Sequence, residues 1–175
     1  RELCASLEMA GWLHSRNDAG YDKSLALFPE DVISWLQETQ VSEYEKVVKP
    51  TESLEKQEKA RDGLLRRLSS ALDLPLDNGG GTLNILRRGF KHETARFEMA
   101  QFKPADNLNP ITLGRFEKMR LRVVQQVFYS SNNRNSIDLV LFANGLPVAT
   151  VELKTDFTQD VQTAVDQYKY DRNPK

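Results

Sequence analysis

The sequence predicts an α/β domain in which helices pack against a mixed central β-sheet. Apolar residues recur at helical spacing through much of the first 75 residues, and strand-like apolar runs follow residue 82. With 175 residues, of which 39% are hydrophobic and 28% charged, the chain can bury the core of one globular domain. We therefore expect a single domain over residues 1–175, with a mainly helical part at 1–75 and a sheet core at 82–175.

Three helices are predicted in the first part. Residues 3–10 carry leucine and alanine at helical spacing, and Gly11 can end this first helix. Pro29 followed by two acidic residues is typical of a helix start and predicts the second helix. A long helix is predicted from about Thr51, and it ends before the Gly-rich loop at 77–81.

The second part is expected to supply the sheet. The predicted strands are 82–87, 94–102, 120–129, 136–143 and 148–154, with a short helix near 110–118 and a closing helix from about 158 to 171. The last two strands flank an Asn-Gly pair, which between apolar runs is a strong signal for a β-hairpin. Residues 136–154 are therefore predicted to fold back on themselves.

Each strand of this hairpin carries a carboxylate where a buried strand normally has an aliphatic residue. These are Asp138 and Glu152. Side chains alternate along a strand, so the two share a face only if the loop has an odd number of residues. A three-residue loop at 144–146 would pair Ala143 with Pro147 and place Asp138 opposite Glu152.

Two carboxylates about 4 Å apart repel by roughly 4 kcal/mol at an effective dielectric constant near 20, so a positive charge should lie between them. Lys154, on the same face, can supply part of it, and Mg²⁺ held by oxygen ligands is the stronger candidate. The alternative is a solvated ion pair among the three side chains. Apolar neighbours argue against it, since strict alternation places Val140 and Phe142 on the face of Asp138.

Asp138 followed by Glu152-x-Lys154 resembles the PD-(D/E)xK nuclease signature, with Ile137 in place of the proline. The surrounding residues, SIDLVLFANGLPVATVELK, resemble the nuclease domain of type I restriction enzyme R subunits. The resemblance extends over most of the chain, including residues 11–12, 21–40 and 164–172. It implies a restriction-endonuclease-like fold and Mg²⁺-dependent hydrolysis of DNA phosphodiester bonds.

The resemblance also implies a role for each residue of the site. Asp138 and Glu152 would ligate Mg²⁺, the carbonyl of Leu153 would add a ligand, and Lys154 would orient the attacking water. Superfamily members often use an extra acid from the first helix, and Glu2 is the best-placed candidate.

Many nucleases of this type carry Gln-x-x-x-Tyr on the helix after the lysine. Here Gln167 is followed by Tyr168 and Tyr170, so the spacing of the tyrosine differs. Gln167 is a candidate for contacting DNA or ordering the site, and either tyrosine is a candidate partner. A helix-surface aromatic packed on the sheet is the alternative for both tyrosines.

The distribution of charge agrees with a nucleic-acid substrate. Residues 61–137 carry 13 Lys or Arg against 7 Asp or Glu, although the whole chain has a net charge of −1. Arg120, Arg122 and Arg134 precede or lie on the strands that lead to Asp138, and we expect them to approach the phosphates of double-stranded DNA. An ordinary solvated basic face is the alternative.

By the same resemblance, the full polypeptide continues into an ATP-driven translocase motor and assembles with methyltransferase and specificity subunits. ATP belongs to that motor, because the Gly-rich loop at 77–81 lacks the spacing and the lysine of a Walker A motif. Two alternatives stay open. One is a stand-alone repair or junction-resolving nuclease of the same superfamily, and the other is a non-catalytic DNA-binding or subunit-docking module of the same fold.

The remaining features argue against several other classes of protein. His14 and His92 are far apart and have no cysteine partners, so a zinc site is not expected. No apolar run approaches the ~18 residues of a membrane span and no signal peptide is visible, so we expect a cytoplasmic piece of a longer chain without membrane contact. The single cysteine, Cys4, is predicted to be a small core residue.

Overall fold

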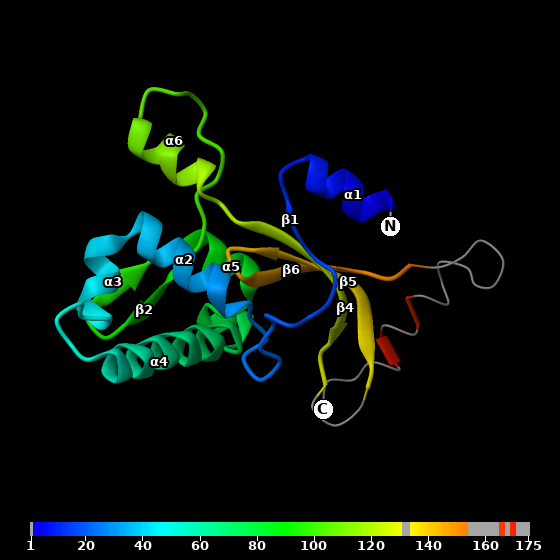
Figure 1. The fold of residues 1–175 in the computed structure, drawn as a ribbon, viewed down its shortest axis with the longest axis horizontal. Helices are drawn as coiled ribbons and strands as arrows, with labels where there is room; N and C mark the ends of the chain where they lie inside the picture. The colour runs from blue at the N-terminus through cyan, green and yellow to red at the C-terminus, as the bar shows by residue number, and fades with distance from the viewer. Residues whose placement is uncertain (1, 131–133, 154–164, 167–168, 171–175) are drawn as a thin grey trace.

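The centre of the fold is a mixed four-stranded sheet in the order β1-β4-β5-β6. The computed structural model describes residues 2–130, 134–153, 165–166 and 169–170. The strands are β1 (Leu13–Ser15), β4 (Leu121–Phe128), β5 (Ser136–Ala143) and β6 (Leu146–Val151). β1 runs parallel to β4, and the other neighbours are antiparallel. Helices flank this sheet (Figure 1), so the predicted α/β architecture is confirmed.

The described residues form six α-helices, most of them at one end of the sheet. They are α1 (Glu2–Met9), α2 (Pro29–Thr39), α3 (Val41–Val47), α4 (Leu54–Leu72), α5 (Thr82–Arg88) and α6 (Pro110–Glu117). A 3₁₀ turn, η1 (Leu76–Asn78), joins α4 to α5, and a small antiparallel ribbon of β2 (Phe90–His92) and β3 (Ala95–Phe97) follows. Of the helices in the described residues, none is both long enough and apolar enough to cross a bilayer.

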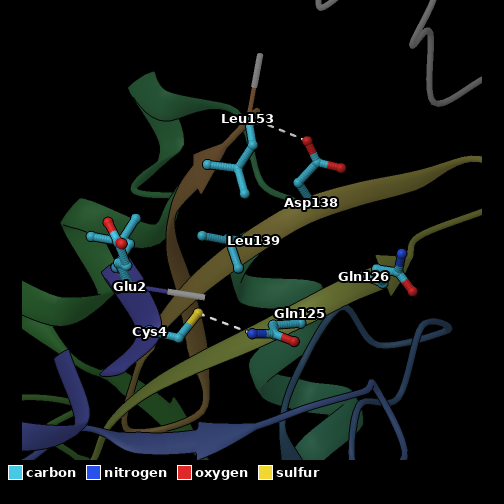
Figure 2. Close-up of a pocket in the computed structure, with 8 residues that line it drawn as sticks. Glu2, Cys4, Gln125, Gln126, Asp138, Leu139 and Leu153 are labelled. Atoms are coloured by element: carbon cyan, nitrogen blue, oxygen red, sulfur yellow. Dashed lines mark hydrogen bonds between the residues drawn. The ribbon is translucent and has the colours of Figure 1, made fainter. Parts of the chain in front are cut away.

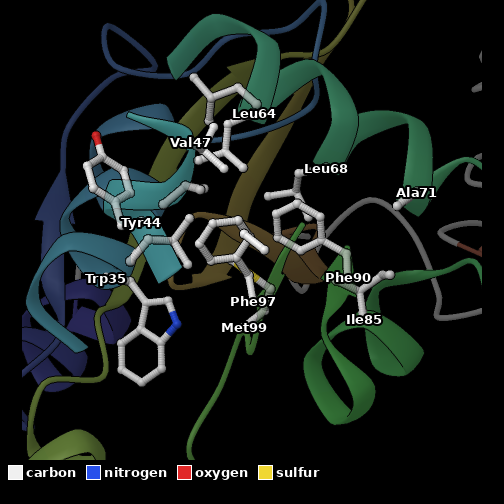
Figure 3. Packing of buried hydrophobic residues seen from close by; sticks show 14 of the residues in the cluster. Trp35, Tyr44, Val47, Leu64, Leu68, Ala71, Ile85, Phe90, Phe97 and Met99 are labelled. Atoms are coloured by element: carbon white, nitrogen blue, oxygen red, sulfur yellow. The ribbon is translucent and has the colours of Figure 1, made fainter. Parts of the chain in front are cut away.

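The largest core lies among α2, α3, α4, α5 and the β2–β3 ribbon (Figure 3). Trp35, Leu64, Leu68 and Phe97 are each at most 1% exposed in this core. Burial of such large apolar side chains stabilises a fold by roughly 1.5–3 kcal/mol each. This core holds the helices at one end of the sheet, where Leu146 at the start of β6 joins the same cluster.

Both faces of the central strands are covered. On one face, Phe28 packs with Val140 and Phe142. On the other face, Cys4 of α1 packs with Val123 and Leu139. Cys4 is 2% exposed, which confirms its predicted place in the core. A charged side chain on β5 therefore stands in largely apolar surroundings.

Several predicted elements differ from the structure. Residues 82–88 form the helix α5 rather than a strand, and the strand predicted at 94–102 is limited to the three residues of β3. Short apolar runs such as the one in α5 fit a helix or a strand equally well from sequence alone. The three-residue strand β1 was not predicted, because its partner β4 lies more than 100 residues further along the chain.

Candidate active site

The β5–β6 hairpin turns through two residues, Asn144 and Gly145, which have φ angles of 47° and 82°. Positive φ at both central residues is the geometry that a two-residue hairpin turn requires, and Asn-Gly favours it. Ala143 consequently pairs with Leu146. The predicted three-residue loop, with Ala143 paired to Pro147, is therefore wrong.

A β-bulge restores the register that the shorter turn would lose. Phe142 pairs with Pro147, but Leu141 pairs with Ala149, so Val148 is an extra residue in β6. Such an insertion shifts all the following pairs by one position. The last pair is Leu139 with Val151, where β6 ends; one further step in the same register would bring Asp138 opposite Glu152.

Asp138 lies in a pocket of about 710 Å³ between α1 and the ends of β5 and β6 (Figure 2). Its carboxylate oxygen Oδ2 accepts a hydrogen bond from the backbone N–H of Leu153, with an N···O distance of 2.8 Å. Asp138 is half-buried. The remaining lining comes from Glu2, Leu3, Cys4, Gln125, Gln126, Leu139 and Leu153. The hydrogen bond fixes the Asp138 carboxylate next to the backbone that carries Glu152.

The alternation of side chains breaks at this point of the sheet. Ile137 packs on the same cluster as Val140 and Phe142, whereas Leu139 packs with Cys4 under α1. Asp138 lines the α1-side pocket together with Leu139. The expectation that Asp138 shares a face with Val140 and Phe142 is therefore wrong, since strict alternation does not hold here.

Gln126 is a site feature that the sequence did not reveal. It stands across from Asp138 on β4, between the recorded pairs of Gln125 with Leu139 and Val127 with Ile137. Its φ is 50°, which is uncommon for a residue other than glycine and unusual inside a strand. No sequence signal points to it, because glutamine carries no marked preference for this conformation.

Glu2 is the second carboxylate placed in the pocket. It begins α1, and Figure 2 shows it on the far side of the pocket from Asp138. Two carboxylates, those of Glu2 and Asp138, therefore line the same pocket, whereas Glu152 is not among the lining residues. Carboxylate oxygens are the ligands that Mg²⁺ prefers, and one or two carboxylates with water commonly suffice for it.

Parts of the predicted site fall outside the described residues. Lys154, Gln167 and Tyr168 are among them, so the structure gives no position for these side chains. Tyr170 is described and is 75% exposed. Within the described part of the chain, no three His, Cys, Asp or Glu side chains form a cluster that could hold a metal ion by themselves.

The predicted arginines lie in two different places. Arg122 forms two hydrogen bonds with the fully buried Asp31, at 2.6 and 2.8 Å, and Arg120 pairs with Glu38 at 2.8 Å. The hydrogen bonds to Asp31 raise the pKa of the Arg122 guanidinium. Both arginines thus have carboxylate partners near the turn end of the hairpin, and their contact with DNA stays a prediction.

Arg134 differs from these two arginines because it is exposed. It lines a surface hollow of about 400 Å³ together with Asp18, Lys23 and Phe128. This hollow lies beside the start of β5, because Arg134 precedes the first residue of that strand by two positions. An exposed guanidinium at this position is available to a phosphate group, which keeps Arg134 as a candidate for DNA binding.

Comparison with curated proteins gives no match, and comparison with solved structures gives none either. A family model does match: residues 9–175 fit the family described as type I restriction enzyme R protein N terminus. The match covers nearly the whole chain and agrees with the mixed sheet flanked by helices, as in a restriction-endonuclease-like domain. The chain therefore belongs to the family of type I restriction enzyme R protein N-terminal domains.

Proposed function

We propose that this domain is the Mg²⁺-dependent endonuclease domain of a type I restriction-modification enzyme and hydrolyses phosphodiester bonds in double-stranded DNA. The observation that carries the proposal is the position of Asp138. It is half-buried, lines a pocket with Glu2, and accepts a hydrogen bond from the Leu153 N–H one residue beyond Glu152. A partly buried carboxylate in a pocket beside a second carboxylate is a functional-site candidate.

The donor set of the pocket fits a hard divalent cation. Asp138 and Glu152 would hold Mg²⁺, with the carbonyl of Leu153 as a further ligand and Glu2 as an additional acid. Such an ion supplies polarisation of the scissile phosphate and a lowered pKa for its bound water. The chain would provide the orientation of these oxygens, because the Leu153 N–H restrains the Asp138 carboxylate.

Lys154 is the residue proposed to act on the attacking water. It follows Leu153 directly, so its backbone is adjacent to the group that binds Asp138. A fixed ammonium there would orient the water and stabilise negative charge that develops on the phosphate. Gln167, with Tyr168 or Tyr170, is proposed to contact DNA or to order this region.

Family membership also guides the proposal on partners. A type I restriction R protein implies association with DNA and with the other subunits of a restriction complex. We propose that these are methyltransferase and specificity subunits, and that ATP is used by a motor outside these residues. The same match favours a restriction enzyme over a stand-alone repair nuclease.

The test is DNA cleavage by the complete, ATP-supplied complex assembled with variant R subunits. Asp138→Ala, Glu152→Ala and Lys154→Ala should each abolish cleavage, because they remove a metal ligand or the ammonium. DNA binding should persist, since phosphate contacts elsewhere supply it. Glu117→Ala is the matched control, because Glu117 is an exposed carboxylate on α6, away from the pocket.

Wild-type cutting by the Lys154 variant would overturn the role given to the lysine. A wild-type complex that binds DNA and hydrolyses ATP but does not cut would favour the non-catalytic module of the same fold.

A further inference from the structure

Gln126 has a backbone conformation that is unusual for a glutamine inside a β-strand. Its φ of 50° lies in the left-handed region, which costs free energy for every residue except glycine and, to a lesser extent, asparagine and aspartate. The pairs on either side, Gln125 with Leu139 and Val127 with Ile137, keep one register. No residue is inserted here, so the positive φ is not the result of a bulge.

The unusual conformation changes which side chains meet at the pocket. In a regular strand two consecutive residues point to opposite faces. Gln125 and Gln126 nevertheless both line the Asp138 pocket, and Val127 packs against the Phe28 cluster on the opposite face. The kink therefore delivers two neighbouring amide side chains to the rim of the candidate active site.

The two amides differ in how the protein uses them. The Gln125 amide donates to Cys4 Sγ at 3.1 Å and so ties β4 to α1. Gln126 is exposed, and within the described residues its amide has no hydrogen bond to the protein. Figure 2 shows its side chain to the right of the other labelled residues, apart from Glu2 and Cys4. A strained residue whose side chain has no partner among the described residues is a candidate for binding a ligand.

We propose that the Gln126 side chain binds the DNA backbone next to the scissile phosphate and thereby positions the strand over Asp138. This inference rests on the proposed nuclease function. A carboxamide carries two N–H donors, which suit a phosphodiester oxygen, and such contacts fix the register of a protein on the duplex. Because the amide is neutral, it binds the phosphate without releasing counterions.

The strain at Gln126 provides the test. Gln126→Gly removes the amide and relieves the left-handed conformation, so the Tm of the R subunit should rise or stay unchanged. Cleavage by the complete complex should fall by roughly threefold to tenfold, as expected for one lost hydrogen bond. Gln126→Asn keeps an amide and tolerates positive φ, and should recover part of this activity.

DNA binding without a divalent cation is the second readout. Affinity for duplex DNA should fall in Gln126→Gly, while the slope of affinity against salt concentration should stay that of wild type, because no charge is lost. Glu93→Gly is the matched control. Glu93 is an exposed residue with φ of 52° in the turn between β2 and β3, outside the pocket, and its replacement should leave cleavage unchanged.

Unchanged cleavage and unchanged DNA affinity in Gln126→Gly would overturn the inference. A fall in activity that accompanies a lower Tm, with no recovery in Gln126→Asn, would also overturn it, because the role would then be structural. If the wild-type complex does not cut DNA, the nuclease proposal fails by itself, and DNA affinity alone decides the role of Gln126. Altered sequence preference in Gln126→Gly would show contact with bases instead of the backbone and would contradict the proposal.

Discussion

Replacing Arg122 with methionine should destabilise the domain strongly, because it leaves a buried carboxylate without its main partner. Asp31 is 0% exposed and receives two hydrogen bonds from Arg122. The guanidinium also lies over the Phe28 ring, 4.1 Å from its centroid, and donates to the Ser15 hydroxyl. Loss of one partner of a buried ion pair typically costs about 3–5 kcal/mol.

The expected cost lies at the lower end of this range. Arg120 has a nitrogen 3.8 Å from Asp31, so it can compensate part of the lost charge. We therefore expect Arg122→Met to lower the free energy of unfolding by about 3 kcal/mol. Urea denaturation of the domain at neutral pH measures this quantity, read from the midpoint at constant m-value.

Arg134→Met is the matched control for this experiment. Arg134 is exposed, so its replacement should change the free energy of unfolding by no more than about 0.5 kcal/mol. If Arg122→Met lowered the free energy of unfolding by less than about 1 kcal/mol, the reasoning would be refuted. A loss that small is typical of an ion pair on the surface, not of a buried one. Lost DNA affinity at unchanged stability would assign Arg122 to DNA binding instead.

Three further predictions concern the turn, acid stability and the isolated domain. Asn144→Ala should lower the free energy of unfolding in urea by about 2–4 kcal/mol, because the buried amide bonds the Met99 carbonyl and the Arg120 N–H; a loss under 1 kcal/mol would contradict this. The hydrogen bond from the Ser24 hydroxyl lowers the pKa of Asp22 below its ordinary value, so the free energy of unfolding should fall as the pH drops through that lowered pKa. The fall should be smaller in Asp22→Asn, and parallel pH profiles of unfolding for the two proteins would argue against this. The isolated domain should show no ATPase activity and weak DNA binding that declines with salt in a gel-shift series, and tight sequence-selective binding would contradict the assignment of specificity to another subunit.

The hairpin shows how far the sequence predicts the site. The approximate positions of both strands follow from the apolar runs and the Asn-Gly pair, while the facing of Asp138 and Glu152 stays a prediction. The turn length was wrong by one residue, and the bulge at Val148 compensates for that error. A bulge carries no clear sequence signal at a β-branched residue, so only the structure could reveal it.

Long-range partners account for most of what the sequence could not predict. Arg122 looked available for DNA because its partner Asp31 is 91 residues away in the chain. The kink at Gln126 is equally invisible in the sequence, since the residues on either side of it make long-range contacts, Val127 with the Phe28 cluster and Gln125 with α1. Local patterns predict where strands lie and which charged residues they carry. Which side chains pair across the fold depends on tertiary structure.

The most direct test of the central claim is the single-turnover rate of DNA cleavage by a complete complex that carries Asp138→Asn. Asparagine keeps an oxygen that can accept from the Leu153 N–H, but it removes the negative charge. We predict a fall of at least about a hundredfold in the cleavage rate, with Tm and DNA-stimulated ATP hydrolysis unchanged. Cleavage at the wild-type rate would contradict the assignment of Asp138 to the chemistry and would leave it the structural role of holding the end of β6.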